Sequence, residues 1–169
     1  MVCAWANFAL SKQITMELKT FYRIRFNDCD SFRHLNNSAY INYMLNARED
    51  HLQEFYSIPM DSLYKKGSGW MVAHHEIVYL APANYGEMVC IHSSLIKYSD
   101  DSLLVEMAMW DENELQLKAL LWTKFIHINI QTGKRDSHPE WFREIAKPME
   151  IITLQQFARM SDRLASLRR

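Results

Sequence analysis

Four long segments of alternating apolar and polar residues, joined by very short polar links, restrict the fold of this chain more than any other feature. Such alternation predicts strands, and links of this length predict that consecutive strands pair antiparallel. The four segments are residues 70–80, 87–98, 102–110 and 115–130. The last of them carries large apolar residues on both faces, which indicates a central strand or a subunit interface.

One strand and one long helix precede this run. Residues 19–28 also alternate and predict a strand with one apolar face. Between Tyr40 and Phe55 apolar residues recur at helical spacing, and Pro59 limits the end of that helix. A helix of about five turns is about 30 Å long, similar to a sheet of four strands with one apolar face to cover. The order of elements therefore predicts an α+β fold in which a curved antiparallel sheet wraps one long helix.

Shorter features complete the chain. They are an irregular stretch at 57–69, a turn at 132–134 and short helices at 139–146 and 153–167. On this basis we divide the chain into a leader that we do not expect to be well ordered (1–18), a folded domain (19–148) and a C-terminal helical extension (149–169).

Composition narrows the class of protein. A net charge of -1 gives no general attraction to nucleic acid or to an anionic membrane. The three cysteines include no CxxC pair, which argues against a disulfide framework or a zinc site and favours a reducing compartment such as the cytoplasm. No apolar run approaches the roughly 18 residues of a membrane span. The apolar start, MVCAWANFAL, lacks the basic residues of a signal peptide, so it is read as a tail or as a consequence of start-site choice.

The loop before the long helix carries the residues whose side chains are suited to catalysis. Its sequence, DCDSFRHLNN from Asp28 to Asn37, places two carboxylates, an imidazole and two amides at a helix start. A helix start offers free backbone N–H groups that can polarise a carbonyl and hold an oxyanion. A carboxylate beside it can attack that carbonyl or activate water. The alternative is that Asp28 and Asp30 only form an Asx-turn and a helix cap.

Two blocks of sequence resemble a known family. RFNDCDSFRHLNNSAYINYM resembles the opening signature of hot-dog thioesterases of the 4-hydroxybenzoyl-CoA and YbgC-like group, and is similar to the second half of plant acyl-ACP thioesterases. EIVYLAPANYGEMVCI (76–91) resembles a second block of the same family. The resemblance spans about residues 19–140. It implies a hot-dog fold, hydrolysis of an acyl thioester, and a homodimer or homotetramer with active sites between subunits. It also implies CoA bound along the surface, with no metal and no cofactor.

The same resemblance suggests roles for individual residues. Asp30 matches the acidic nucleophile or general base, and Asn37 matches the position whose backbone N–H polarises the carbonyl. His34 matches a histidine that orients substrate or assists water, and Tyr40 matches an aromatic residue near the acyl pocket. Asp28 is expected to brace the loop.

The remaining polar residues are candidates for substrate binding, for a thiol nucleophile or for a metal site. Asn36 and Arg33 are candidate substrate-binding residues, Arg33 for the CoA phosphates. Cys29 lies between two carboxylates, which disfavours a reactive thiolate. The neighbouring His74 and His75 point to opposite faces of a strand and so do not predict a metal site.

Three alternative functions remain open. Phe32 stands where the plant enzymes carry an asparagine two residues after the catalytic aspartate, which weakens an acyl-ACP thioesterase without excluding it. The motifs of hot-dog dehydratases are absent from the sequence, so that activity ranks low. The last alternative is an acyl-thioester-binding module without turnover, because fold does not prove function.

Overall fold

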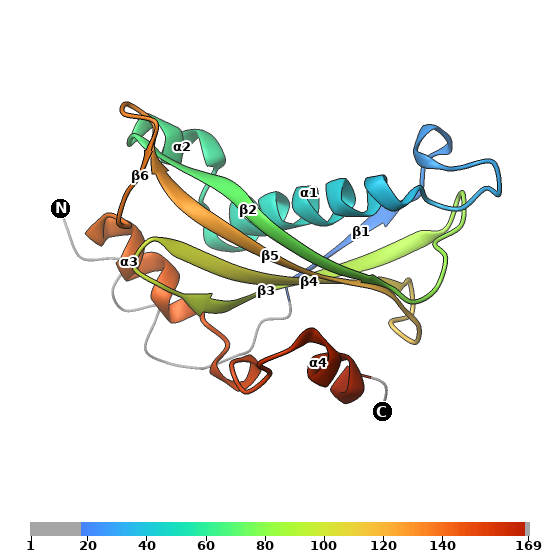
Figure 1. Ribbon diagram of the computed structural model, residues 1–169. Helices are drawn as coiled ribbons and strands as arrows, with labels where there is room; N and C mark the ends of the chain where they lie inside the picture. Colours follow the sequence, from blue (N-terminus) through green and yellow to red (C-terminus); the bar gives the residue numbers. More distant parts are fainter. Residues whose placement is uncertain (1–17, 168–169) are drawn as a thin grey trace.

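The computed structural model describes residues 18–167. A six-stranded antiparallel sheet curves around one long helix, and the short C-terminal helices lie on the other side of the sheet (Figure 1). The strands are β1 (Lys19–Arg23), β2 (Ser68–Tyr79), β3 (Met88–Tyr98), β4 (Ser102–Asp111), β5 (Leu117–Asn129) and β6 (Lys134–Arg135). The α-helices are α1 (Asn37–Tyr56), α2 (Met60–Lys65), α3 (Glu140–Ala146) and α4 (Met160–Leu167). The strand order is β1-β3-β4-β5-β2, with β6 paired to β5. The long helix and a β3-β4-β5 meander are confirmed, but the expected pairing of the first two long strands is wrong, because β2 pairs with β5 and β3 pairs with β1.

Helix α1 packs its apolar face into the hollow of the sheet. Tyr40, Met44 and Ala47 are buried there against alternate residues of β3, β4 and β5. The helix ends because Ser57 adopts a left-handed conformation, with φ of 54°, and its N–H donates to the carbonyl of Leu52. The arrangement is the hot-dog architecture that the resemblance implies.

The outer face of the sheet is covered by the C-terminal segment. Leu120 and Trp122 of β5 pack there against Met160 and Leu164 of α4, while Leu121 of β5 faces α1. Strand β5 is therefore buried on both faces because it lies between β4 and β2 and is covered from both sides. The sequence indicated either a central strand or a subunit interface for this segment, and the structure shows a central strand.

One strand boundary predicted from the sequence is wrong. Strand β1 ends at Arg23 rather than at residue 28, because its partner β3 begins at Met88, next to a turn at Gly86 with φ of 81°. Residues Phe26–Asp28 form a short 3-10 helix instead, and the side chain of Phe26 is 75% exposed.

Two helical predictions also need correction. The stretch predicted to be irregular contains helix α2. The helix predicted over 153–167 is broken: a 3-10 turn at Ile152–Leu154 is followed by α4. The leader predicted for residues 1–18 lies almost entirely outside the described residues. None of the helices within residues 18–167 combines the length and the apolarity needed to span a bilayer.

Candidate active site

The loop between the 3-10 helix and α1 is held by backbone hydrogen bonds at both ends. The N–H of Asn36 donates to the carbonyl of Asp28 (2.8 Å), which closes the loop on itself. The N–H of Leu35 donates to the carbonyl of Ala83 (2.8 Å), which ties the loop to the turn before β3. The loop is therefore a fixed platform at the start of α1, visible at the blue end of the helix in Figure 1.

Asp30 divides its two carboxylate oxygens between different environments. Oδ1 accepts hydrogen bonds from the backbone N–H groups of Phe32 (2.9 Å) and His34 (3.0 Å), which is the Asx-turn geometry. Within residues 18–167 no donor hydrogen-bonds Oδ2, and the residue is exposed. The structural role and a chemical role therefore do not compete, because they use different oxygens.

The start of α1 is capped in a way that leaves one backbone donor available. The side-chain oxygen of Asn36 accepts hydrogen bonds from the N–H (3.0 Å) and the hydroxyl (2.8 Å) of Ser38. The hydroxyl of Tyr79 donates to the carbonyl of Asn37 (2.9 Å). No acceptor among residues 18–167 hydrogen-bonds the N–H of Asn37, so this donor can meet an external carbonyl at the positive end of the helix dipole.

The other candidate side chains lie around this platform. Tyr40 is buried, and its hydroxyl accepts a hydrogen bond from the N–H of Ala83 (2.9 Å), so it fixes the turn behind the loop. Burial raises the pKa of the Tyr40 phenol. The ring of His34 is partly buried and stacks on Phe32 with centroids 6.5 Å apart. Arg33 is exposed, with its guanidinium 5.7 Å from the ring centroid of Tyr85.

Comparison with known proteins identifies the family to which this chain belongs. The model of the thioesterase-like superfamily matches residues 24–146, which include this loop and the strands that follow. The chain belongs to the thioesterase-like superfamily. The expectation of a thioester hydrolase with a hot-dog fold is thereby confirmed. A comparison with curated proteins found no match.

Solved structures share the fold of this superfamily member. The probable thioesterase YbaW from Escherichia coli is 24% identical, with a TM-score of 0.69 over 79% of this chain and 99% of that one. The hypothetical protein TT1821 from Thermus thermophilus is also 24% identical, with a TM-score of 0.73 over 80% and 99%. SAV2348 from Staphylococcus aureus, solved in complex with CoA, is 13% identical, with a TM-score of 0.70 over 78% and 82%. At these identities the likeness concerns the fold.

Sequence analysis missed the partner that braces the loop of this thioesterase. The hydroxyl of Tyr43 donates to Oδ2 of Asp28 (2.6 Å) and accepts from the N–H of Arg25 (3.2 Å). Burial, followed by the hydrogen bond to Asp28, raises the pKa of Tyr43 to about 12, so it stays a donor. No sequence spacing links Tyr43, on the helix, to Asp28 in the loop.

The thiol of Cys29 is engaged within the loop. Its Sγ donates to the carbonyl of Arg25 (3.2 Å). Burial, together with the carboxylates of Asp28 and Asp30, raises the pKa of the Cys29 thiol, which disfavours a thiolate nucleophile.

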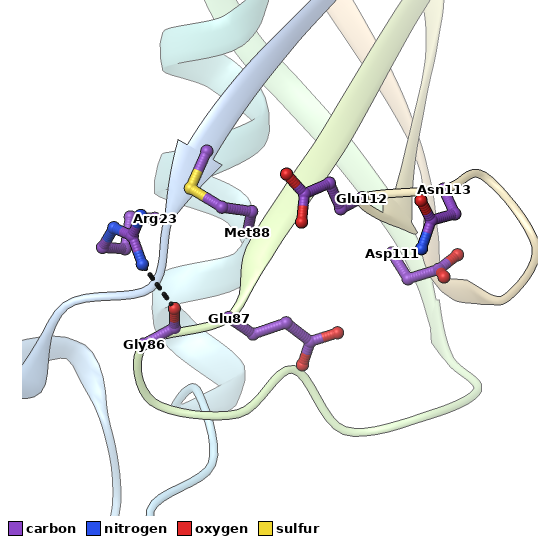
Figure 2. A pocket seen from close by; sticks show the side chains of 7 residues that line it. All are labelled: Arg23, Gly86, Glu87, Met88, Asp111, Glu112 and Asn113. Atoms are coloured by element: carbon purple, nitrogen blue, oxygen red, sulfur yellow. Dashed lines mark hydrogen bonds between the residues drawn. The ribbon is translucent and has the colours of Figure 1, made fainter.

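A surface hollow of about 420 Å³ lies beyond the turn at Gly86, and Figure 2 shows its lining. Arg23 donates to the carbonyl of Gly86 (3.0 Å) at one side of it. Three acidic residues, Glu87, Asp111 and Glu112, also line it. A lining with more acids than bases repels phosphate groups, so we do not assign CoA to this hollow.

Proposed function

We propose that this chain is an acyl-CoA thioesterase in which Asp30 is the catalytic carboxylate. The observation that carries the proposal is that the two oxygens of Asp30 differ: Oδ1 holds the loop that leads into α1, and no donor within residues 18–167 hydrogen-bonds Oδ2. Membership of the thioesterase-like superfamily supports the reaction type.

The proposed mechanism uses the two groups that the platform leaves available. The thioester carbonyl oxygen accepts a hydrogen bond from the N–H of Asn37, and the helix dipole stabilises the negative charge that develops on it. Asp30 then either takes a proton from an attacking water or attacks the carbonyl carbon itself, forming an anhydride that water hydrolyses. In both routes the C–S bond breaks, CoA leaves as a thiolate that takes up a proton, and the free acid is released.

Supporting roles are proposed for the surrounding residues. His34 orients the substrate or the water, because its partly buried ring stands on the same loop as Asp30. Tyr40 shapes the acyl site through the turn that its hydroxyl holds, and Asn36 fixes the helix start by capping. The exposed guanidinium of Arg33 is suited to the phosphates of CoA, since Arg binds such groups with several donors.

We propose a CoA ester as the substrate, instead of an acyl group on a carrier protein, because of the residue at position 32, which is Phe32. This side chain is 76% exposed at the position where the plant carrier-protein enzymes have an asparagine. The test is steady-state hydrolysis of a panel of acyl-CoAs of different length and aromaticity, compared with the same acyl groups on acyl carrier protein. We expect turnover with a preference for the CoA esters. A preference for the carrier form would support the alternative thioesterase, and tight binding without hydrolysis would support a binding module.

We further propose that two copies associate through β2. This strand is at the edge of the sheet, and Met71, Val72 and Tyr79 expose apolar surface along it. Tyr79 also contacts Asn37, so a second copy paired to β2 lies next to the proposed site.

The assembly is tested by light scattering after gel filtration. Wild type is expected to form a homodimer or homotetramer. Met71→Lys is expected to form monomers and lose hydrolysis, because a charge on an edge strand opposes pairing. Leu115→Lys, in an exposed turn, serves as the matched control. A monomeric wild type with full activity would refute this interface.

A further inference from the structure

Three potential metal ligands converge on the outer face of the sheet, which is the face turned away from α1. Cys90 and His92 stand two residues apart on β3, so their side chains share one face. Their neighbours Val89 and Ile91 point the other way, into the core against α1. Glu114 reaches the same place from the turn between β4 and β5.

The distances between the three atoms fit a single ion. Sγ of Cys90 lies 3.4 Å from Nε2 of His92, and that nitrogen lies 3.0 Å from Oε2 of Glu114. All three atoms lie within 4.8 Å of one another. In a zinc tetrahedron with the usual bond lengths, the S–N and N–O edges are about 3.5 Å and about 3.4 Å. These two edges therefore fit an ion after shifts of a few tenths of an ångström, and the third edge, between Sγ of Cys90 and the carboxylate of Glu114, must reach about 3.6 Å.

The carboxylate is already oriented for this role. Lys19 donates to Oε1 of Glu114 (2.6 Å), which turns Oε2 toward His92. The turn that carries Glu114 is itself fixed, because Oδ1 of Asp111 accepts from the N–H groups of Leu115 (2.7 Å) and Gln116 (2.6 Å). Such an outer partner resembles those that orient ligands in known metal sites.

We propose that Cys90, His92 and Glu114 bind one divalent ion of the zinc class, with water in the fourth position. A thiolate and an imidazole select zinc-class transition metals, whereas magnesium and calcium require mainly oxygen ligands. On binding, a metal–sulfur bond forms and the thiol proton passes to solvent. The family resemblance and the lack of a CxxC pair both predicted no metal, whereas the pairing of β3 with β4 brings the third ligand here from a distant part of the sequence.

The site is tested with Co²⁺ as a spectroscopic substitute for Zn²⁺. The full chain carrying Cys3→Ser and Cys29→Ser is the working protein, since Cys90 is then its remaining thiol. We expect one equivalent of Co²⁺ to produce a thiolate-to-cobalt charge-transfer band and tetrahedral d–d bands, which Zn²⁺ bleaches and Mg²⁺ does not. Adding Cys90→Ser should abolish the charge-transfer band.

Two milder variants keep the test informative if that change disturbs folding. His92→Gln and Glu114→Gln alter partly exposed side chains, and each should weaken Co²⁺ binding by more than about 100-fold. Lys19→Met removes the orienting partner and should keep the band while weakening binding about tenfold. Absence of the charge-transfer band in the working protein, or unchanged binding in the folded His92→Gln variant, would overturn the proposal.

Discussion

A buried histidine makes the stability of this fold depend on pH. His51 on α1 is 0% exposed, its Nδ1 lies 2.7 Å from Oγ of Ser93, and its Nε2 has no hydrogen-bond partner among residues 18–167. Burial lowers the pKa of His51 to about 4, and the nearby positive charge of Arg48 adds to this effect. His92 lowers the pKa further and Asp50 opposes it. We therefore expect the imidazole to be neutral in the folded protein.

The magnitude follows from proton linkage. An unfolded histidine has a pKa of about 6.5, so between about pH 6.5 and about pH 4 the unfolded state binds the proton that the folded state excludes. The free energy of unfolding therefore falls as the pH falls through this range. Relative to pH 7, the loss at pH 5 from this one group is about 2 kcal/mol.

Urea unfolding at pH 7 and pH 5 measures the effect. The free energy of unfolding of wild type should fall by about 2 kcal/mol more than that of His51→Gln, because other titrating groups are common to both proteins. The matched control His74→Gln changes an exposed histidine and should behave as wild type. An equal pH dependence in wild type and His51→Gln would refute the reasoning.

Two further predictions concern side chains that lock distant segments together. Tyr43→Phe leaves the carboxylate of Asp28 without its donor, so we expect a loss of about 1.5–3 kcal/mol in urea unfolding and a lower kcat. An unchanged kcat would show that this brace does not position the loop. Arg163→Ala on α4 leaves Glu106, which is 4% exposed, without its ion-pair partner at 2.9 Å, so we expect a loss of about 3 kcal/mol or more. Arg159→Ala, which alters an exposed pair, is the control, and equal losses in the two variants would contradict the idea.

The sequence predicted the architecture because hydrophobic periodicity is set by the chain itself. The helix from Asn37 to Tyr56 and the four long strands lie where their periodicity places them. Local rules failed where tertiary contacts decide. Arg48 is 8% exposed on the inner face of α1, although charged residues usually stay outside. Helix α2 was missed because six residues between a proline and a glycine give little periodic signal.

For the candidate site, the sequence predicted which loop carries it but not the hydrogen bonds that arrange its side chains. The sequence indicated a carboxylate at Asp30 in the loop that leads into the long helix, and in the structure Oδ1 of Asp30 holds that loop. Which oxygen of Asp30 holds the loop depends on backbone N–H groups whose directions follow from the fold. The brace from Tyr43 and the contact of Tyr79 with Asn37 come from segments far apart in sequence, so no single-sequence pattern predicts them.

The central claim is tested most directly by the kcat of Asp30→Asn for acyl-CoA hydrolysis. An asparagine oxygen can still accept from the N–H groups of Phe32 and His34, so the loop should be retained while the carboxylate is lost. We expect kcat to fall by at least about 100-fold with the unfolding free energy little changed, while the exposed control Asp61→Asn keeps the wild-type rate. A folded Asp30→Asn variant with the wild-type kcat would contradict the account.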